Sequence, residues 1–337
     1  MQIHNNLRAL RLRRATLALS LSFGALLGSS SSSWAQTPAL KKARAAMPPQ
    51  VGVYRMKIGD FNVTALSDGT IPISLHNLLT NVKPGQVTHT LEHDVLKDPV
   101  ETSVNAYLIE AGSRLILVDT GSGELYGPTL GYLPNSLHAA GVRPEQITDV
   151  LITHIHTDHS GGLMNYQALA FPNAAIHIAK REVEFWLNPQ NIAKFPTRKK
   201  LFAEARAKVA PYIKAGKVKT FSGDVQLFPG ISTLAAYGHT AGHTVYVLES
   251  KGQKMQFWGD MMHAASLQFP DPDVTIVFDT DSRMAAATRK KYMVDAAKQG
   301  YWVAFDHVAF PGVGHIRTEG KGYRWIPINY SDDGSGQ

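Results

Sequence analysis

The sequence predicts an α/β fold in which two packed β-sheets are covered by helices. Apolar runs of strand length recur along the chain, and several are joined by tight turns, as in β-hairpins. Helical patterns are inserted between these runs, as expected when helices cover the sheets. The chain has 337 residues, of which 44% are apolar, which is enough to bury a substantial core. Periodicity alone does not establish four layers, so an αββα arrangement is an expectation.

Hairpin strands and one helix are expected in the first half of the chain. The apolar stretches are Tyr54–Leu66, Ser103–Ile109 and Leu115–Val118, the last two joined through residues 111–114. A helix is expected around Asn135–Ala140, where Gly141 would end it, and a buried strand at Asp149–Thr153.

The second half alternates the same two kinds of element. Strands are expected at Ala174–Ala179, Ile231–Ala236, Thr244–Glu249, Lys254–Trp258 and Tyr301–Phe305, with a tight turn at Lys251–Gln253. A helix with an apolar face is expected from Leu201 to Tyr212, ending at Gly216. Ser282 is a suitable N-cap for a last long helix that ends at Gly300.

The first 35 residues have the pattern of a signal peptide. Four arginines precede the apolar run Ala15–Leu27, and Ser33-Trp34-Ala35 offers small residues at the positions that a signal peptidase reads. A transmembrane anchor, the alternative, needs about 20 apolar residues, and this run is shorter. We therefore expect cleavage after Ala35 and a periplasmic or secreted protein. The arginine pair at 13 and 14 leaves both the general secretory and the twin-arginine routes open.

One domain is expected after this segment. Residues 36–50 are rich in Ala, Lys and Pro and are interpreted as a flexible leader. No later stretch resembles an interdomain linker, so residues 51–337 are expected to fold together.

Composition and charge exclude several classes of protein. The chain has no cysteine, which excludes a disulfide-stapled miniprotein and a thiolate-ligated zinc ribbon. The formal net charge is +7, but the segment 1–35 holds four arginines and no acidic residue. The remainder has 30 basic and 27 acidic residues, and a net charge of +3 does not indicate a nucleic-acid-binding surface.

Four potential metal ligands follow the strand expected at 149–153. His154 and His156 are two residues apart, so on an extended segment they point to the same side and can bind one ion. Where the strand ends, Asp158 and His159 can turn toward a second ion. Imidazole and carboxylate suit zinc, and also manganese, iron and cobalt. The alternative is a polar loop whose histidines make only hydrogen bonds, as we expect for isolated histidines such as His138 and His177.

The pattern His-x-His-x-Asp-His over residues 154–159 resembles the signature of the metallo-β-lactamase superfamily. The resemblance covers nearly the whole chain after the signal peptide. It implies an αββα sandwich with a dinuclear site at one edge of its two sheets. Residues 51–337 would then be a hydrolase domain that holds two divalent metal ions, with zinc expected.

The resemblance implies roles for further residues. Asp119 resembles the family's aspartate that holds a ligand histidine by its outer nitrogen, with a plain Asp-Thr-Gly turn as the alternative. In the segment 238–244, His239 matches the ligand, and His243 is expected either to support the site or to be packed in the core. Asp260, which follows a strand and Gly259, is expected to bridge both ions; a lone Gly-Asp turn is the alternative.

The last ligand is expected at the end of the strand Tyr301–Phe305. His307 is preferred over His315 because a ligand at a strand end is held more firmly than one in a glycine-rich loop. The seven expected ligands are His154, His156 and His239 for the first ion, Asp158, His159 and His307 for the second, and Asp260 for both. Asp158 and Asp260 are the expected catalytic carboxylates.

Two adjacent ions explain how such a site hydrolyses its substrate. Ions roughly 3.5–4 Å apart lower the pKa of a shared water and stabilise developing oxyanion charge, so no serine or cysteine nucleophile is needed. The absence of cysteine disfavours the lactamase subgroup with a thiolate ligand. His156 stands where oxygen-reducing flavodiiron relatives would carry glutamate, which also favours hydrolysis.

Other segments resemble the methyl parathion hydrolase group, which splits neutral organophosphate triesters and whose near relatives open lactones and aryl esters. The segments are Gly59–Phe61, Thr64–Thr70, Glu101–Val104 and Gly320–Arg324. Tyr126 and Trp186 are expected to form an apolar wall of the substrate pocket, with core packing as the alternative for each.

Three pocket positions differ from the phosphotriesterase pattern. His263 and Phe278 replace leucine, and Leu78 stands where arginine is expected. We therefore expect a hydrolase of lactones or aryl esters with promiscuous phosphotriesterase activity on methyl parathion; a dedicated organophosphate (methyl parathion) hydrolase is the alternative. The expected partner is a small-molecule ester, with no nucleic acid and, after signal cleavage, no membrane. A homodimer is compatible with the sequence.

Two other classes of protein are disfavoured. A nucleic-acid-processing relative would need a further substrate domain and a basic surface. A non-catalytic binding protein on the same fold would have lost ligands, whereas all seven positions are filled here.

Overall fold

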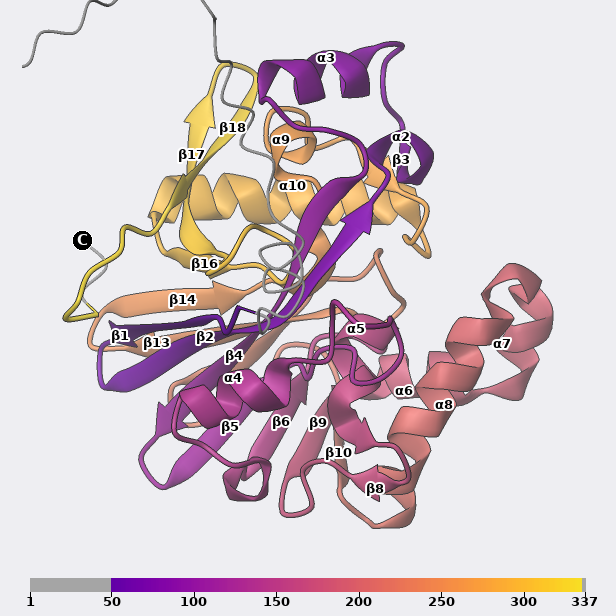
Figure 1. The fold of residues 1–337 in the computed structure, drawn as a ribbon, viewed down its shortest axis with the longest axis vertical. Helices are drawn as coiled ribbons and strands as arrows, with labels where there is room; N and C mark the ends of the chain where they lie inside the picture. The colour runs from indigo at the N-terminus through magenta and orange to yellow at the C-terminus, as the bar shows by residue number, and fades with distance from the viewer. Residues whose placement is uncertain (1–49, 335–337) are drawn as a thin grey trace, which may run out of the picture. The chain divides into compact units, whose positions relative to one another are not determined.

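Two seven-stranded β-sheets carry the fold in the computed structural model, which describes residues 50–334 (Figure 1). The predicted signal peptide, and the leader apart from Gln50, lie outside the described residues. In spatial order the first sheet contains β1 (Val53–Ile58), β2 (Phe61–Ile73), β4 (Val100–Ala111), β5 (Arg114–Val118), β6 (Asp149–Ile152), β9 (Ala175–Ala179) and β10 (Val218–Phe221). The strands from β1 to β5 pair antiparallel, and those from β5 to β10 pair parallel.

The second sheet is antiparallel except for one pair. Its spatial order is β11 (Gln226–Phe228), β12 (Ile231–Ala235), β13 (Thr244–Ser250), β14 (Gln253–Phe257), β16 (Trp302–Ala304), β17 (Val313–Glu319) and β18 (Gly322–Pro327). Only β14 and β16 pair parallel, because the helix α10 connects them. Two short ladders complete the strands: β3 (Leu79–Thr80) with β15 (Thr275–Ile276), and β7 (Met164–Asn165) with β8 (Ala168–Leu169).

The helices are short apart from two. They are α2 (Leu75–Leu78), α3 (Gln86–His93), α4 (Leu133–Ala139), α5 (Thr157–Ser160), α6 (Lys180–Leu187), α7 (Pro189–Lys194), α8 (Lys199–Lys214), α9 (Ala265–Gln268) and α10 (Ser282–Gln299). Single 3-10 turns lie at Pro144–Gln146, Gly161–Leu163, Pro196–Arg198 and Gly259–Met261. Within the described residues, none of the helices combines the length and the apolar character that crossing a membrane requires.

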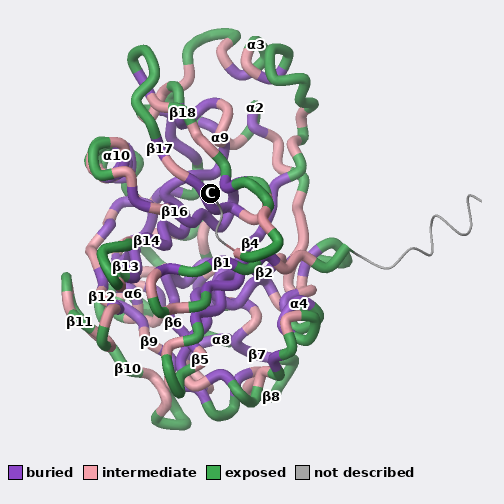
Figure 2. The backbone as a smooth tube through the Cα atoms, turned by 90° about the vertical axis from the view of Figure 1, so that its left-hand side faces the viewer, coloured by how far each residue is buried: buried purple, intermediate pink, exposed green. Residues whose placement is uncertain are grey.

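Successive side chains along a strand point to opposite faces of its sheet, so they pack either against the helices or against the other sheet. On β6, Val150 and Ile152 pack toward α4, α6 and α8, whereas Leu151 packs between the two sheets. On the far side, Val245 and Val247 of β13 pack with side chains of α10. The central strands of both sheets are largely buried, whereas the edge strands β10, β11 and β18 are mostly half-buried or exposed (Figure 2). The order is therefore helices, sheet, sheet and helix, which confirms the predicted αββα sandwich.

Most of the predicted elements are present, and the structure adds others that were not predicted, among them α3, α6, β10 and β11. The N-cap of α10 is Asp281 rather than Ser282, because the Asp281 carboxylate accepts the Met284 backbone N–H at 2.9 Å. The hairpin of β17 and β18 was not expected as strands, since its glycine-rich turn was interpreted only as a family segment. Gly141, Gly216 and Gly300 follow helices with positive φ, as predicted.

Several strands from both sheets end at one shared edge. β5 leads into Asp119, β6 into His154, β14 into Asp260 and β16 into His307. Because β5 and β6 run parallel, and β14 and β16 also run parallel, the carboxyl end of each pair presents its following residues together. The predicted ligands therefore lie where the two sheets meet at this edge.

Candidate metal centre

Three histidines and one carboxylate form the first group of candidate ligands. His154, His156, His239 and Asp260 are all buried, and each offers one nitrogen or oxygen atom to the group. The Nδ1 atom of His156 lies 3.0 Å from Nε2 of His154 and 3.0 Å from Nε2 of His239. The short helix α5 begins just after His156, so the chain turns there and sends the next two predicted ligands to the other side of the site.

The second group contains Asp158, His159 and His307. Nε2 of His159 lies 3.8 Å from Oδ2 of Asp158, and Nε2 of His307 lies 3.3 Å from the same oxygen. His307 is held by its other nitrogen, Nδ1, which lies 2.9 Å from the Ser103 carbonyl oxygen. The structure thus brings all three predicted residues of this group together.

Asp260 connects the two groups because each of its carboxylate oxygens faces one of them. Oδ2 lies 3.1 Å from Nε2 of His239 and 3.5 Å from Nε2 of His154. Oδ1 lies 2.9 Å from Nε2 of His159 and 3.0 Å from Nε2 of His307. Neighbouring ligands of a tetrahedral ion bound at 2.0–2.1 Å are separated by about 3.3 Å. The spacing of the donor atoms therefore fits two divalent ions that share Asp260.

The hydrogen bonding of two buried ligand atoms supports the same interpretation. Nε2 of His159 and Oδ1 of Asp260 are buried and lie 2.9 Å apart, but among the described residues neither atom makes a hydrogen bond of suitable geometry. Buried polar atoms are rarely left without a partner, because desolvation is then uncompensated. A cation between these atoms would satisfy both. The described chain therefore contains a site suited to two divalent metal ions.

The protonation of the histidines reflects how carboxylates are distributed in the site. Burial, assisted by neighbouring histidines, lowers the pKa of His154 and His156 well below the usual value. Burial also opposes the charged form of His159 and His307, but nearby carboxylates, Asp260 first among them, raise the pKa of both. Burial also opposes the charged form of His239 in the first group, but Asp260 and Asp279 raise its pKa to about 9, so carboxylates favour a cation in both groups.

Asp119 and His243 take the supporting positions that were predicted for them. Asp119 lies 2.9 Å from Nδ1 of His159, and it also accepts the backbone N–H and the hydroxyl of Thr153, the residue before His154. His243 is fully buried, and its Nε2 accepts the Asp260 backbone N–H at 3.1 Å. These contacts fix ligand side chains and the backbone that carries the bridging carboxylate.

Three buried carboxylates near the ligands were missed from the sequence. Asp279 lies 2.8 Å from Nδ1 of His239. Asp306, next to His307 in the chain, lies 3.1 Å from Nδ1 of His159, and burial beside Asp119 raises its pKa well above the usual value. Asp306 directly follows the predicted strand, so its position was the one available signal; no local pattern marks Asp279.

The third buried carboxylate that was missed from the sequence belongs to Glu182, on α6. Its carboxylate accepts four hydrogen bonds: one from the backbone between His154 and His156, one from Trp186 on the same helix, and two from the stretch after His239. The donors are Ile155 N, the Trp186 indole, the Thr240 hydroxyl and Gly242 N.

A small pocket opens directly over both groups. It has a volume of about 120 Å³ and is lined by His156, Asp158, Asp260 and His307 together with Ile71, Ile73, Thr102, Tyr126, Leu201, His263 and Phe278. Tyr126, His263 and Phe278 therefore lie where the sequence placed them. His263 is also within 3.0 Å of Asp260 Oδ2 through its Nε2.

Two predicted pocket residues do not line this pocket. Trp186 is fully buried, packs against Phe202 and meets the ring of His156 edge-on, so the core alternative is correct. Leu78 packs in the small apolar cluster of α2 and α3, and its carbonyl accepts the Val277 N–H beside the pocket.

His315 lies outside both groups. Its ring packs on Trp302, with ring centroids 3.8 Å apart, and its Nδ1 lies 3.1 Å from the Tyr301 carbonyl oxygen. The preference for His307 agrees with this geometry, but the prediction that His315 lies in a glycine-rich loop is wrong, because His315 is part of strand β17 and pairs with Ile326.

The sequence profile of the metallo-beta-lactamase superfamily matches residues 99–297, more than half of the chain. The chain belongs to this superfamily. The structure of hydrolase AbOPH, described as in the beta lactamase superfamily, is 36% identical and superposes with a TM-score of 0.80 over 85% of this chain and 100% of that one. AidC, a dizinc quorum-quenching lactonase, is 28% identical, with a TM-score of 0.76 and the same coverage.

Relatives of established activity match this superfamily member over a shorter range. The acyl-coenzyme A thioesterase MBLAC2 of Homo sapiens is 26% identical over 179 residues, which is 48% of this chain and 60% of that protein. The N-acyl homoserine lactonase AiiA of Bacillus thuringiensis subsp. kurstaki is 27% identical over 164 residues, 43% of this chain and 58% of the lactonase. The chain therefore spans about 60% of the length of these relatives.

Proposed function

We propose that this protein is a dinuclear metal-dependent hydrolase of neutral esters. Lactones or aryl esters are its preferred substrates, and methyl-parathion-type phosphotriesterase activity is a weaker side reaction. The observation that carries the proposal is the position of Asp260, whose two oxygens face two separate donor groups beneath one pocket. The thioesterase, lactonases and hydrolase to which the chain is similar support hydrolysis as the reaction class.

We assign the first ion to His154, His156 and His239 and the second to Asp158, His159 and His307, with Asp260 shared. Imidazole dominates both donor sets, and this composition favours zinc. When bound, the two ions would activate a water and polarise the ester carbonyl.

The chain's own residues keep this chemistry in place. Asp260 fixes the separation of the two donor groups, and His243 holds its backbone. Asp158, whose side chain is 20% exposed, is the more accessible of the two proposed catalytic carboxylates and faces the pocket, where it can orient the attacking water. Tyr126 and Phe278 line the pocket with aromatic rings and limit the entry of further water.

Pocket size favours a planar ester over a phosphotriester. A phosphotriester centre carries three ester substituents and needs room for all of them, whereas a lactone presents a flat acyl group. The 120 Å³ pocket is narrowed by His263, whose ring stacks at 5.3 Å on that of His307. This crowding disfavours a dedicated organophosphate hydrolase.

The proposal is tested by metal analysis together with steady-state kinetics. Purified protein should contain two zinc ions per chain and show kcat/KM for dihydrocoumarin and phenyl acetate about tenfold or more above that for methyl parathion. Asp260→Ala should lose metal and most activity and retain a folded circular dichroism spectrum. Methyl parathion as the best substrate would instead identify an organophosphate hydrolase, and full turnover by the Asp260 variant would refute the assignment of the bridge.

Export is proposed on the sequence of residues 1–35 alone. Expression of the full chain in a bacterium, followed by fractionation and N-terminal sequencing, should give a periplasmic protein that begins at Gln36. An uncleaved chain in the cytoplasm would contradict export.

A further inference from the structure

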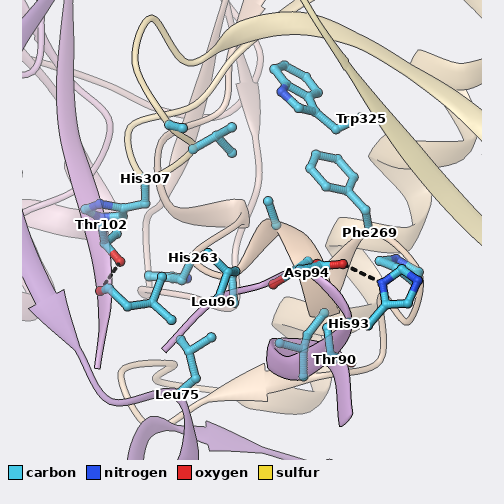
Figure 3. Close-up of a pocket in the computed structure, with 18 of the residues that line it drawn as sticks. Leu75, Thr90, His93, Asp94, Leu96, Thr102, His263, Phe269, His307 and Trp325 are labelled. Carbon is cyan, nitrogen blue, oxygen red and sulfur yellow. Dashed lines mark hydrogen bonds and ion pairs between the residues drawn. The ribbon is translucent and has the colours of Figure 1, made fainter. Parts of the chain in front are cut away.

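The walls of the pocket over the metal ligands come from separate parts of the chain. Thr102, His263 and His307 also line a larger neighbouring cleft of about 640 Å³, so they form the boundary between the two spaces (Figure 3). Tyr126 lines the pocket but not the cleft, and it belongs to the segment 122–132, which contains no helix or strand and leads from β5 to α4. The position of the Tyr126 ring therefore depends on what holds this segment.

A single buried carboxylate binds both ends of the segment. Asp68, on β2, is fully buried, and its Oδ2 accepts the backbone N–H of Ser122 at 2.9 Å and that of Gly131 at 3.1 Å. Its Oδ1 accepts the N–H of Leu133, the first residue of α4, at 2.9 Å. Burial raises the pKa of Asp68 to about 6, so at pH 7 the carboxylate is ionised and only accepts hydrogen bonds.

The packing around Asp68 leaves the segment little room to shift. Gly121, just before the segment, has a φ of +66°, and a Cβ atom at this position would lie 2.3 Å from Asp68 Cγ. The Tyr132 N–H donates to the Asp68 carbonyl oxygen at 3.0 Å, and the Thr70 N–H donates to the Thr129 carbonyl oxygen at 3.1 Å. The segment is therefore bound to β2 through Asp68 and its close neighbours.

A second contact holds the middle of the segment. Oε1 of Glu124 lies 2.6 Å from Nζ of Lys208, a lysine of α8 that is only 4% exposed. Tyr126 follows Glu124 by two residues, so in the chain it lies between this ion pair and the end of the segment that Asp68 binds. Attachment on both sides fixes the ring against the pocket.

The residues before the segment are held independently of Asp68. The backbone N–H and the hydroxyl of Thr120 both donate to the His159 carbonyl oxygen at 2.8 Å. Asp119 lies 2.9 Å from Nδ1 of the same histidine. Release of the segment should therefore move Tyr126 and leave the ligand His159 in place.

We propose that Asp68 is a positioning residue for substrate specificity. By holding the segment 122–132, it keeps the Tyr126 ring against the pocket and the pocket narrow enough to favour planar esters over phosphotriesters. Asp68 does not line the pocket, so its effect on the substrate passes through the segment. The inference rests on the proposed function and adds a determinant of its substrate class that lies outside the pocket.

The first test compares Asp68→Asn with the wild-type protein. The amide of asparagine places a donor where a carboxylate oxygen accepted, so at least one of the three N–H groups loses its partner. In zinc-loaded protein, the ratio of kcat/KM for dihydrocoumarin to kcat/KM for methyl parathion should fall about tenfold, with the zinc content unchanged. A general loss of folded protein would lower both values together and leave their ratio as it was.

Three further variants separate a positioning role from a merely structural one. Lys208→Met releases the middle of the segment without removing the charge of Asp68, and it should lower the same ratio. Adding Asp68→Asn to Tyr126→Ala should change the ratio by less than about twofold, because the ring on which Asp68 acts is then absent. Asp149→Asn is the matched control and should leave the ratio unchanged. Asp149 is also buried and has three hydrogen-bond partners, but it lies at the start of β6, at the opposite end from His154.

Several results would refute the role of Asp68. They are an unchanged ratio in Asp68→Asn, loss of zinc from that variant, and effects of Asp68→Asn and Tyr126→Ala that multiply in the double variant. If Asp68→Asn does not fold, an unchanged ratio in Lys208→Met refutes the proposal instead. Hydrolysis of neither ester by the zinc-loaded wild-type protein would refute the proposed function itself, whereas the other outcomes leave that function standing.

Discussion

Replacing Glu182 with glutamine should weaken both the fold and the binding of the first metal ion. Oε1 accepts the Ile155 N–H at 2.9 Å and the Trp186 indole N–H at 2.6 Å, and Oε2 accepts the Thr240 hydroxyl at 2.9 Å and the Gly242 N–H at 2.6 Å. Each oxygen therefore faces two donors, and glutamine replaces one oxygen with an amide that is itself a donor.

The cost follows from the least damaging orientation of that amide. Its oxygen should stay at the Oε1 position, because neither Ile155 N–H nor the Trp186 indole can accept a hydrogen bond. The Thr240 hydroxyl can reverse and accept from the new NH₂ group, but the Gly242 N–H cannot. One buried donor is left unpaired at about 1–3 kcal/mol, and the other bonds lose the assistance of the carboxylate charge. We expect the free energy of unfolding to fall by about 2–4 kcal/mol.

The metal effect arises from what the four bonds connect. Ile155 lies between His154 and His156, and Thr240 directly follows His239, so Glu182 holds together the two segments that carry the first group of ligands. Loosening such a contact typically costs 10–100-fold in metal affinity, and we expect about tenfold or more.

Two measurements check this prediction separately. Urea unfolding of metal-free protein gives the stability, and competition with a zinc chelator gives the affinity. Glu184→Gln is the control, since Glu184 is on the same helix, is 63% exposed and pairs only with Lys180 at 3.6 Å among the interactions found for it. If Glu182→Gln matches Glu184→Gln in both measurements, Glu182 does not connect the two segments.

Three further predictions address the ligands, the substrate specificity and the pH dependence of stability. His307→Ala should lose one metal ion per chain by elemental analysis and His315→Ala none; the reverse result would exchange their roles. His263→Leu should lower kcat/KM for dihydrocoumarin and raise it for methyl parathion, each by about tenfold or 1.4 kcal/mol, and equal changes would remove His263 from the specificity argument. Burial raises the pKa of Asp149, but hydrogen bonds from three neighbours outweigh burial and lower it, so the ionised form stabilises the fold. This contribution is present above the unfolded-state pKa of about 3.9 and is lost as the pH falls through the lowered folded-state value. Asp149→Asn should therefore lower the free energy of unfolding, measured in urea, by about 1–2 kcal/mol at pH 7 and by less at pH 3. An equal loss at both pH values would show that the negative charge of Asp149 does not contribute to stability.

The sequence predicted those parts of the site that are encoded locally. His154, His156, Asp158 and His159 lie within six residues at a strand end, so the strand and the turn after it position them together. His307 was chosen over His315 by the same reasoning, and the structure places it among the candidate ligands.

What the sequence could not predict depends on contacts between distant elements. Glu182 and Asp279 are single acidic residues without a distinctive pattern, and only tertiary packing brings them to His154 and His239. Trp186 shows the same limit for aromatic residues, because an amphipathic helix carries an aromatic ring toward a pocket or toward the core with the same spacing.

The two donor groups draw their residues from both halves of the sandwich. His154, His156, Asp158 and His159 follow a strand of the first sheet, whereas His239, Asp260 and His307 follow strands of the second. Neither half alone carries all the proposed ligands of either ion. Metal binding therefore requires the two halves to be packed together. If the chain is split in the loop between β10 and β11 and expressed as two fragments, tight zinc binding should appear only after the fragments are mixed. Bound zinc should in turn slow the dissociation of the two fragments.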